Sequence, residues 1–405
     1  MTDFDVIVVG AGAAGLAATR HLMEVGREVT CLESADRIGG RAYTDTTIFG
    51  VPFDMGAHWL HYGAQNAFVP IGRNSGFDIY EASEELFFKG DLSEAAFDRV
   101  LHTLEQKVQA PQDMPMSKAV IPRDDQERTA LFLKALSAGR DLDEISMHEW
   151  ATAGLEQDNW YCREGFGTIV TRNGAGLPVH LNAPVKDISR TKARVEIETL
   201  GGKMTARQVI VTVSVGVLAS EAIRFDPPLE TARLRALDAI TMGTYNHIAL
   251  QFTHDSLPVG PDTWAGYPIT ELSGTHAPDG GILTNISGTG LCVFEHIGSF
   301  ARELEDAGPE TAITFALDQM ANVFGSDVRK GFVKGFATRW ASNPHTRGAY
   351  SGTLPSGAGQ RGALRSAHAE TIHFAGEAMN EGETVTVSGA HKEGLRAAKD
   401  ALAAL

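Results

Sequence analysis

Three glycines near the start of this 405-residue chain have the spacing of a diphosphate-binding turn. Gly10, Gly12 and Gly15 form the pattern G-x-G-x-x-G, and Glu33 follows 23 residues after Gly10. In such a pattern the first glycine permits a tight turn, the second lets a pyrophosphate approach the backbone, and the third lets a helix pack closely on a strand. The acid can accept hydrogen bonds from an adenosine ribose. The pattern predicts a dinucleotide site for NAD or FAD, although a glycine-rich turn can also be purely structural.

A second segment able to contact a diphosphate follows directly. It runs from Ser34 to Arg41 and contains Arg37 and the adjacent glycines Gly39 and Gly40. Backbone N–H groups and guanidinium groups are both good donors to phosphate oxygens. We therefore expect this segment to extend the dinucleotide site, and the alternative is a charged surface turn.

Apolar runs and amphipathic patterns indicate the elements that position these residues. Residues 4–9 (FDVIVV) are a β-branched run ending at a glycine, which is typical of a buried parallel strand. With a helix over 12–26 and a strand over 27–33, they predict a βαβ unit. Amphipathic spacing predicts helices within 97–108 and 125–138. Further elements are expected as strands at 179–181, 194–199, 208–213, 247–252 and 371–376, helices at 309–324 and 388–405, and loops around a short strand or two over 253–281.

Composition and charge narrow the classes of partner. The chain has 51 acidic and 35 basic residues, and its net charge of −16 disfavours nucleic acid and anionic membranes while weakly suiting a cationic small molecule. Cys31, Cys162 and Cys292 are far apart and indicate neither a disulfide framework nor a zinc site. The first residues lack the basic region of a signal peptide, and the longest uncharged run near them, 14 residues, is too short to span a bilayer. We expect a cytoplasmic protein without a metal.

In this combination the motifs resemble those of the flavin-containing amine oxidase family. In that family the G-x-G-x-x-G, the acid and a following R-x-G-G-R, here residues 37–41, together bind FAD. The resemblance continues to about residue 398. The similar segments are 53–61 (FDMGAHWLH) beside the flavin ring, 183–185 (APV) whose valine backbone contacts adenine, 209–218 as an internal FAD-domain strand and turn, 339–350 as a tryptophan-to-tyrosine stretch, and 374–377 (FAGE) with 388–390 as the last FAD motif.

The resemblance implies a set of FAD-binding residues spread along the chain. Glu377 is expected to bond a ribityl or pyrophosphate hydroxyl, and the alternative is a plain acid at a strand end. Gly389 is expected to permit close approach at the start of the last helix, whose positive end can stabilise reduced flavin. Because Ala349 stands where some members carry a flavin-linked cysteine, FAD should be noncovalent. The full set is Gly10, Gly12, Ala14, Gly15, Glu33, Ser34, Gly40, Arg41, Gly56, Ala57, His58, Trp59, Val185, Trp340, Gly376, Glu377, Thr384 and Val385.

The resemblance also places the reacting part of the site. His247 stands where many members have a lysine that holds a water against flavin N5; a histidine, with an ordinary pKa of ~6.5, could hold that water, act as a base, or be structural. Tyr350 matches one wall of an aromatic pair around the substrate nitrogen. Glu383 stands at the other wall, where it could pair with a cationic amine or face solvent. The expected catalytic residues are His247, Tyr350 and Glu383, and the expected substrate-cavity residues are His58, Trp59, His61, Tyr350 and Glu383.

The function implied by the resemblance is FAD-dependent oxidation of an amine. A neutral amine passes hydride from its α-carbon to flavin N5, the imine hydrolyses, and O2 reoxidises the flavin to give H2O2. One alternative is a flavin dehydrogenase or desaturase that acts on a C–C or cyclic C–N bond with another electron acceptor. A noncatalytic FAD protein and an NAD-dependent dehydrogenase explain fewer of the motifs. The expected partner is a small-molecule amine, and the protein is expected to be a monomer or a homodimer.

For the architecture we predict an α/β fold with two domains. A Rossmann-like FAD-binding domain of the glutathione-reductase type is expected to be discontinuous, from residues 1–75, 160–240 and 350–405. Residues 76–159 and 241–349 are expected to form an α+β substrate domain with helices on a mixed or antiparallel sheet. The flavin ring should lie at the interface, where clefts commonly form.

Overall fold

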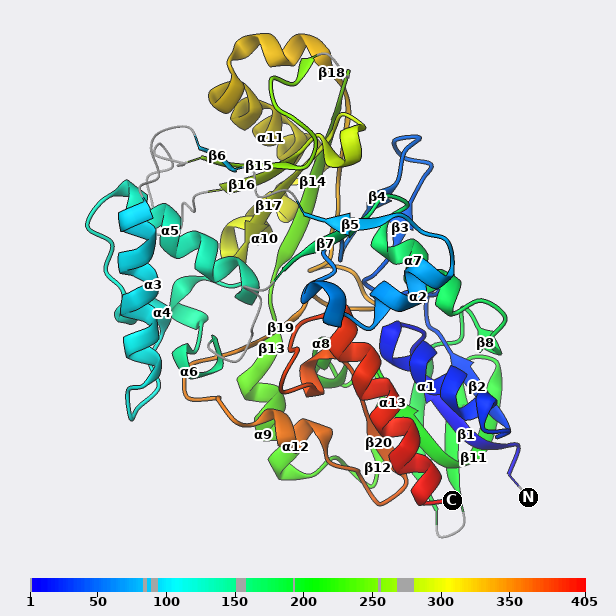
Figure 1. The fold of residues 1–405 in the computed structure, drawn as a ribbon. Helices are drawn as coiled ribbons and strands as arrows, with labels where there is room; N and C mark the ends of the chain where they lie inside the picture. The colour runs from blue at the N-terminus through cyan, green and yellow to red at the C-terminus, as the bar shows by residue number, and fades with distance from the viewer. Residues whose placement is uncertain are drawn as a thin grey trace.

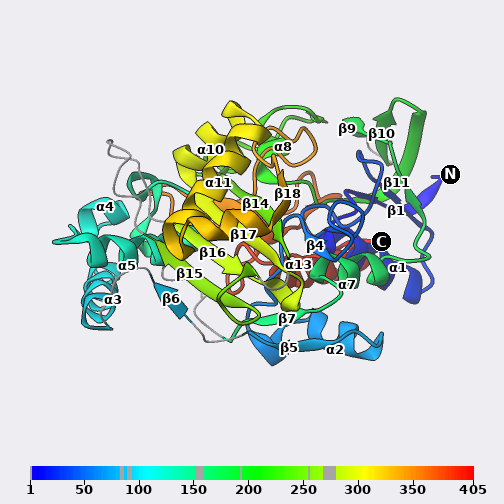
Figure 2. The ribbon, with the colours of Figure 1, turned by 90° about the horizontal axis from the view of Figure 1, so that it is seen from above.

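The structure is a computed structural model, and it describes residues 2–82, 86–88, 94–150, 158–191, 194–253, 256–267 and 280–405. Two sheets organise these residues, each covered by helices (Figure 1). A group of helices formed by residues 94–150 lies beside the second sheet (Figures 1 and 2). Within the described ranges, no helix combines the length and the apolar character needed to cross a membrane.

The larger sheet contains the predicted βαβ unit. Within the described part of the chain its strands follow the order β12-β9-β10-β11-β1-β2-β8, and β20 also pairs with β11. The pairs β1/β2, β1/β11 and β11/β20 are parallel, whereas β9/β10 and β10/β11 are antiparallel. The strands are β1 (Phe4–Val9), β2 (Val29–Leu32), β8 (Val179–His180), β9 (Val185–Arg190), β10 (Val195–Thr199), β11 (Gly202–Val211), β12 (Arg224–Asp226) and β20 (Ile372–Phe374).

At β1 both faces of this sheet are buried, as the apolar run of this strand predicts. Alternate residues of a strand point to opposite faces. Val6 and Val8 therefore join the core under α1 (Ala13–Glu24) and α13 (Val387–Ala403), while Ile7 and Val9 join the core under the helices on the other face. Those helices are α8 (Val215–Ala219), α9 (Thr231–Ala239) and α12 (Arg361–Arg365).

The contact between α1 and α13 depends on small side chains. A β-carbon on Gly394 would lie 2.0 Å from the carbonyl oxygen of Ala14, so the two helix backbones touch at this point. Figure 1 shows these helices, from the two ends of the chain, packed side by side.

The second sheet is mainly antiparallel, in the described order β18-β14-β17-β16-β15-β6, with β15/β6 parallel. Ile248 and Leu250 of β14 face a core with the helices α10 (Gly298–Ala307) and α11 (Pro309–Phe324), so His247 and Ala249 point to the opposite face. The strands are β6 (Leu86–Phe88), β14 (Tyr245–Phe252), β15 (Thr263–Tyr267), β16 (Gly280–Thr284), β17 (Leu291–Ile297) and β18 (Phe332–Ala337).

The helices predicted within 97–108 and 125–138 form a separate small core that contacts the second sheet through Ile297 and Tyr245. They are α3 (Glu94–Val108) and α5 (Asp125–Ala135), with α4 (Met116–Ala119) and α6 (Met147–Trp150) between and after them. Shorter elements complete the described fold: the pairs β3 (Thr44–Asp45) with β4 (Phe53–Asp54), β5 (Ile79–Glu81) with β7 (Trp160–Cys162) and β13 (Ile240–Met242) with β19 (Ser351–Thr353), and the helices α2 (Phe68–Asn74) and α7 (Phe166–Asn173).

The predicted elements agree with the observed ones to within a few residues at most ends, and the helix over 309–324 has the expected bounds. The strand expected at 208–213 is the end of the longer β11. In the loop region expected over 253–281, residues 254–255 and 268–279 lie outside the described residues, and the described part contains β15 and the start of β16.

Candidate active site

One large cavity of about 1630 Å³ extends between the two sheets. At one end it is lined by Gly10 and Gly12, where β1 leads into α1, and at the other end it reaches Phe97 and Leu101 of α3. The carboxyl ends of parallel strands are the usual place for a ligand crevice in open α/β sheets. The cavity therefore joins the predicted dinucleotide site to a space beside the second sheet and the helices.

Gly15 and Gly12 of the G-x-G-x-x-G turn differ in what a side chain at each position would meet. A β-carbon on Gly15 would lie 1.8 Å from the carbonyl oxygen of Gly10, so this glycine is needed for packing inside the protein. A β-carbon on Gly12 would meet no protein atom within 4 Å and would project into the cavity. Gly12 is followed by the N-terminus of α1, whose free N–H groups favour an anion. This open cradle fits a pyrophosphate.

Glu33 lies at the end of β2 beside this cradle. Its Oε2 accepts a hydrogen bond of 2.6 Å from the N–H of Ala11, and its Oε1 accepts one of 2.8 Å from the N–H of Ala35. The carboxylate therefore ties the two glycine-containing segments together while it still lines the cavity. Further along, a β-carbon on Gly40 would lie 3.3 Å from the Cα of Gly12, so the second segment crosses closely over the first.

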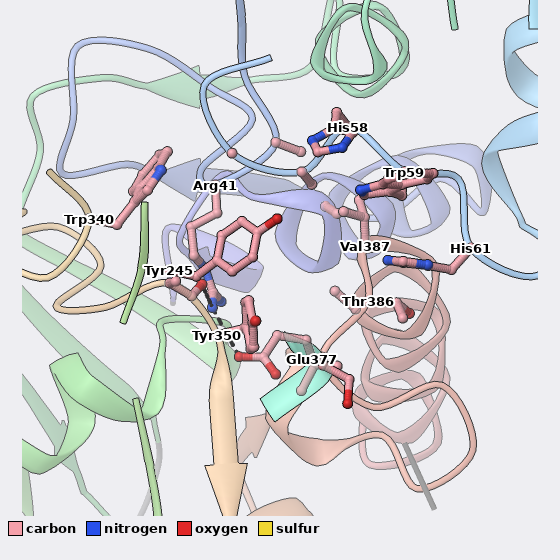
Figure 3. A pocket seen from close by; sticks show the side chains of 18 of the residues that line it. Arg41, His58, Trp59, His61, Tyr245, Trp340, Tyr350, Glu377, Thr386 and Val387 are labelled. Carbon is pink, nitrogen blue, oxygen red and sulfur yellow. Dashed lines mark hydrogen bonds and ion pairs between the residues drawn. The ribbon is translucent and has the colours of Figure 1, made fainter. Parts of the chain in front are cut away.

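Arg41 and Glu377 form an ion pair on the cavity wall, 2.9 Å apart, in which Glu377 is buried and Arg41 is partly exposed (Figure 3). The Arg41 guanidinium also donates to the carbonyl oxygen of Ala349 at 2.9 Å. Glu377 accepts further hydrogen bonds from the N–H and the hydroxyl of Ser351, at 3.1 and 2.7 Å. These contacts fix both charged groups against the cavity without leaving either one unpaired.

The N-terminus of α13 also faces the cavity. Thr386 caps the helix by accepting a hydrogen bond of 2.9 Å from the N–H of Gly389, and Val385, Thr386 and Val387 line the cavity (Figure 3). A 17-residue helix carries a partial positive charge at this end. The reason for Gly389 differs from the one expected, because its β-carbon would lie 2.1 Å from the carbonyl oxygen of Glu383. Gly389 therefore serves packing inside the protein.

His247 presents an unprotonated nitrogen to the cavity. Its Nδ1 lies 2.9 Å from the carbonyl oxygen of Asp54, and because a carbonyl can only accept, Nδ1 carries the proton and donates it. Nε2 is buried and has no hydrogen-bond partner among the described residues. Burial lowers the pKa of His247 to about 4, since the charged imidazolium would lose its hydration. Near neutral pH the side chain is therefore an uncharged acceptor.

Aromatic side chains surround this nitrogen. The ring of Tyr245 lies 5.5 Å from that of His247 and 5.7 Å from that of Tyr350, measured between centroids. The hydroxyl of Tyr350 donates to the carbonyl oxygen of Leu136, which ties this ring to the helical region. Figure 3 shows Tyr245 and Tyr350 next to each other, beside the side chain of Arg41 and above Glu377 in this view.

The segment with the sequence AHWLH forms another part of the wall. His58 lies between the rings of Trp59 and His247, with centroid distances of 4.9 and 5.1 Å. The Nδ1 of His61 is 2.7 Å from the amide oxygen of Asn159, and burial lowers the pKa of His61 to about 4. Burial also lowers the pKa of His58 well below its ordinary value. His58, His61 and His247 are thus neutral near pH 7.

The structure brings most of the sequence-predicted site residues together on the cavity wall. Glu383 is different, because its carboxylate pairs with Lys392 of α13. The substrate role expected for Glu383 thus has no geometric support and stays a prediction. Four predicted residues are absent from the cavity lining in the described ranges: Gly15, Val185, Thr384 and Glu383. Those on the wall are Gly10, Gly12, Ala14, Glu33, Ser34, Gly40, Arg41, Gly56, Ala57, His58, Trp59, His61, His247, Trp340, Tyr350, Gly376, Glu377 and Val385.

Sequence reasoning missed part of the cavity lining, including Tyr245, Trp264 and Glu295. Tyr245 could have been found, because it lies two residues before His247 and a strand repeats its facing every second residue. Glu295 carried a weaker signal, because it is an acid that directly follows the apolar run 291–294. Its place opposite His247 depends on strand register, which the sequence does not display.

The chain matches a family model and relatives that are named as polyamine oxidases or histone demethylases. The family model for flavin containing amine oxidoreductases matches residues 13–150 and 127–402. Polyamine oxidase 4 of Oryza sativa subsp. japonica is 29% identical over 439 residues, covering 98% of this chain and 88% of that protein. Lysine-specific histone demethylase 2 of Homo sapiens is 28% identical, covering 97% of this chain and 53% of that protein.

Solved structures share the fold over nearly the whole chain. Wild-type putrescine oxidase bound to putrescine superposes with a TM-score of 0.80 at 21% identity, covering 99% of both chains. Cyclohexylamine oxidase from Brevibacterium oxydans IH-35A superposes with a TM-score of 0.81 at 19% identity, again covering 99% of both.

Proposed function

The chain belongs to the flavin-containing amine oxidoreductase family, and from that premise we propose that it oxidises an amine at the α-carbon and passes the electrons to O2. It is an oxidoreductase of the α/β fold with a Rossmann-like FAD-binding part, and its cofactor is FAD. FAD is bound noncovalently, since Ala349 precedes Tyr350 and Cys31, Cys162 and Cys292 are absent from the cavity lining in the described residues. When bound, FAD supplies the hydride acceptor.

We propose the following residues for holding FAD. Gly12 and the N-terminus of α1 bind the pyrophosphate, supported by the open space beside Gly12. Arg41 and Glu377 form a fixed polar wall in the middle of the cavity, and the N-terminus of α13 provides a positive partial charge. We also propose a discontinuous FAD domain from residues 1–75, 160–240 and 350–405. The strands of the larger sheet, which come from 4–32, 179–226 and 372–374, support this division.

The observation that carries the proposed reaction is the arrangement of Tyr245, Tyr350 and His247 on one wall. The two tyrosine rings restrict the position of an amine, which supplies orientation of its C–H bond. His247 Nε2 has a free lone pair that accepts a hydrogen bond from a water or from the incoming amine. Aromatic walls exclude bulk water from the reacting centre. Glu383 is outside this arrangement, so we do not assign it to the reaction.

A spectroscopic experiment tests the proposal. The purified protein should show a flavin spectrum that bleaches when amines are added without oxygen, and the colour should return with release of H2O2 when air is admitted. Absence of bleaching with every amine of a broad panel would refute the proposed function. Bleaching without peroxide on aeration would instead favour a dehydrogenase that uses another acceptor.

A further inference from the structure

A network of buried polar groups runs behind the cavity wall, from the cofactor region to the helical region. It begins with the Arg41–Glu377 ion pair, which lines the cavity (Figure 3). It continues through Ser351, Arg361 and Glu149, which are outside the described cavity lining. Arg361 is only 4% exposed, so the protein buries a full positive charge at this point. Neither the sequence motifs nor the proposed reaction accounts for that charge.

Arg361 holds Glu377 by two routes. Its Nη1 donates to the hydroxyl oxygen of Ser351 at 3.0 Å, and this hydroxyl donates to Oε2 of Glu377 at 2.7 Å. The same Nη1 donates at 2.9 Å to the carbonyl oxygen of Ala378, the residue that follows Glu377. Ser351 is fully buried, so bulk water does not compete for its hydroxyl. The carboxylate on the cavity wall therefore takes its position from a guanidinium that does not reach the cavity.

Arg361 also binds the helical region. Its Nε donates to the carboxylate of Glu149, whose side chain is 13% exposed. Glu149 belongs to α6, and the next residue, Trp150, lines the cavity. The N–H of Ser146, directly before α6, donates to the carbonyl oxygen of Thr353 at 3.1 Å. Helix α6 is therefore joined to β19 and α12 at the point where it contributes a residue to the cavity wall.

The energies of these contacts depend on one another. The four charged groups alternate in sign along the network, in the order Arg41, Glu377, Arg361 and Glu149. Removing one partner of a buried pair leaves the other charge uncompensated, which is strongly unfavourable. Arginine suits the central position because its planar guanidinium presents donors in several fixed directions at once, whereas lysine is a single point charge. A change of charge at Glu149 therefore alters the electrostatic and hydrogen-bonding environment of Glu377.

We propose that Arg361 is a positioning residue for Glu377 and that, through Glu149, it links FAD binding to the docking of α6. Coupling between two equilibria is reciprocal: if docking of α6 favours FAD, FAD must favour docking of α6 to the same extent. The part of the wall that Trp150 contributes is then held most firmly in the protein that already carries its cofactor. This inference rests on the proposed placement of FAD against Arg41 and Glu377.

The Kd for FAD, measured by titrating FAD into each apoprotein, tests the link. Glu149→Gln keeps the shape of the side chain, removes its charge and should raise this Kd about 5-fold or more, although Glu149 does not line the cavity. Arg361→Met should raise the Kd further, and Arg361→Lys should give an intermediate value because lysine keeps the charge but not the planar fork. Adding Glu149→Gln to Arg361→Met should have no further effect. Independent, additive effects of the two substitutions would overturn the link.

Glu127→Gln is the matched control. Glu127 is also a buried acid of the helical region, but it pairs with Arg99 and Arg123 outside the described cavity lining. Its substitution should leave the Kd for FAD close to the wild-type value. An increase equal to that in Glu149→Gln would show that general destabilisation of the helical region is sufficient, and would overturn the link. Thermal unfolding of each apoprotein fixes a titration temperature at which every variant is folded.

Hydrogen exchange measures the reciprocal effect without any turnover. In the wild type, FAD should slow amide exchange in residues 142–150 relative to the apoprotein, and in Glu149→Gln this slowing should be much smaller. Residues 309–324 of α11 are the internal reference, since they are outside the described cavity lining. Equal slowing of residues 142–150 in the wild type and in Glu149→Gln would overturn the link.

Arg41→Ala, measured beside these variants, separates this inference from the proposals on which it rests. Weaker FAD binding in Arg41→Ala, with unchanged binding in both Glu149→Gln and Arg361→Met, would overturn the link alone. Unchanged binding in Arg41→Ala would overturn both the assignment of the ion pair to FAD and the link. Because neither FAD titration nor hydrogen exchange involves an amine, a flavin that no amine bleaches would refute the proposed oxidation and leave the link standing.

Discussion

A substitution at Gly12 tests cofactor binding without disturbing the fold. Its backbone has φ −79° and ψ −175°, an extended conformation open to any residue, and its β-carbon would meet no protein atom within 4 Å. Gly12→Val therefore adds atoms only to the cavity. We expect the free energy of unfolding of the apoprotein to change by less than about 1 kcal/mol, as is usual for a substitution without strain or clash.

The effect on FAD should be large by comparison. The added isopropyl group occupies the place where a pyrophosphate meets the N-terminus of α1. Hydrogen bonds to charged groups contribute about 1.5–3 kcal/mol each, so displacing the phosphate from two N–H donors costs roughly 3–6 kcal/mol, or a Kd raised 100-fold or more. Gly12→Ala should give a smaller increase, because it adds a single carbon.

Titration of FAD into apoprotein, followed by flavin fluorescence, measures this Kd, and thermal unfolding of the apoprotein measures the fold. Gly382→Val is the matched control, since its β-carbon also meets no atom within 4 Å but this exposed glycine is outside the described cavity lining. Gly15→Ala should instead damage the fold itself, given the 1.8 Å approach to a carbonyl oxygen. Wild-type FAD affinity in Gly12→Val would refute the pyrophosphate assignment.

Three further predictions concern the middle of the cavity. His247→Ala should slow flavin reduction or reoxidation while FAD stays bound, and stopped-flow traces unchanged in both half-reactions would return His247 to a structural role. Since the folded pKa of His247 is about 4 against ~6.5 unfolded, protons favour the unfolded chain, and stability falls as the pH drops from about 6.5 to about 4. His247→Gln should reduce the loss between pH 7 and pH 4.5 by roughly 2 kcal/mol in chemical denaturation, and an identical pH dependence would contradict the buried neutral imidazole. Arg41→Ala should lower both flavin content and melting temperature, because it leaves Glu377 without its cation; a variant with both values unchanged would show that the pair is dispensable.

Much of the fold could be predicted because it depends on local patterns. The β-branched run of β1, the glycine turn and the following helix specify a βαβ unit within the first 33 residues. The amphipathic spacing of α3 and α5 and the proline at the start of α11 likewise act within one element. Element ends were less certain, because helix and strand ends depend on neighbours that a local pattern does not contain.

The sequence by itself determined the dinucleotide turn, the charged segment after it and the types of side chain available for chemistry. Only the tertiary structure decided which of them meet. The register between β14 and β17 places Glu295 opposite His247, and the contact of the helical region with the second sheet sets Tyr350 beside Tyr245. Glu383, the acid expected at the substrate, pairs with Lys392 of α13. Strand register and helix packing join residues far apart in the chain, and free energies of burial and pairing, which no local spacing records, decide those contacts.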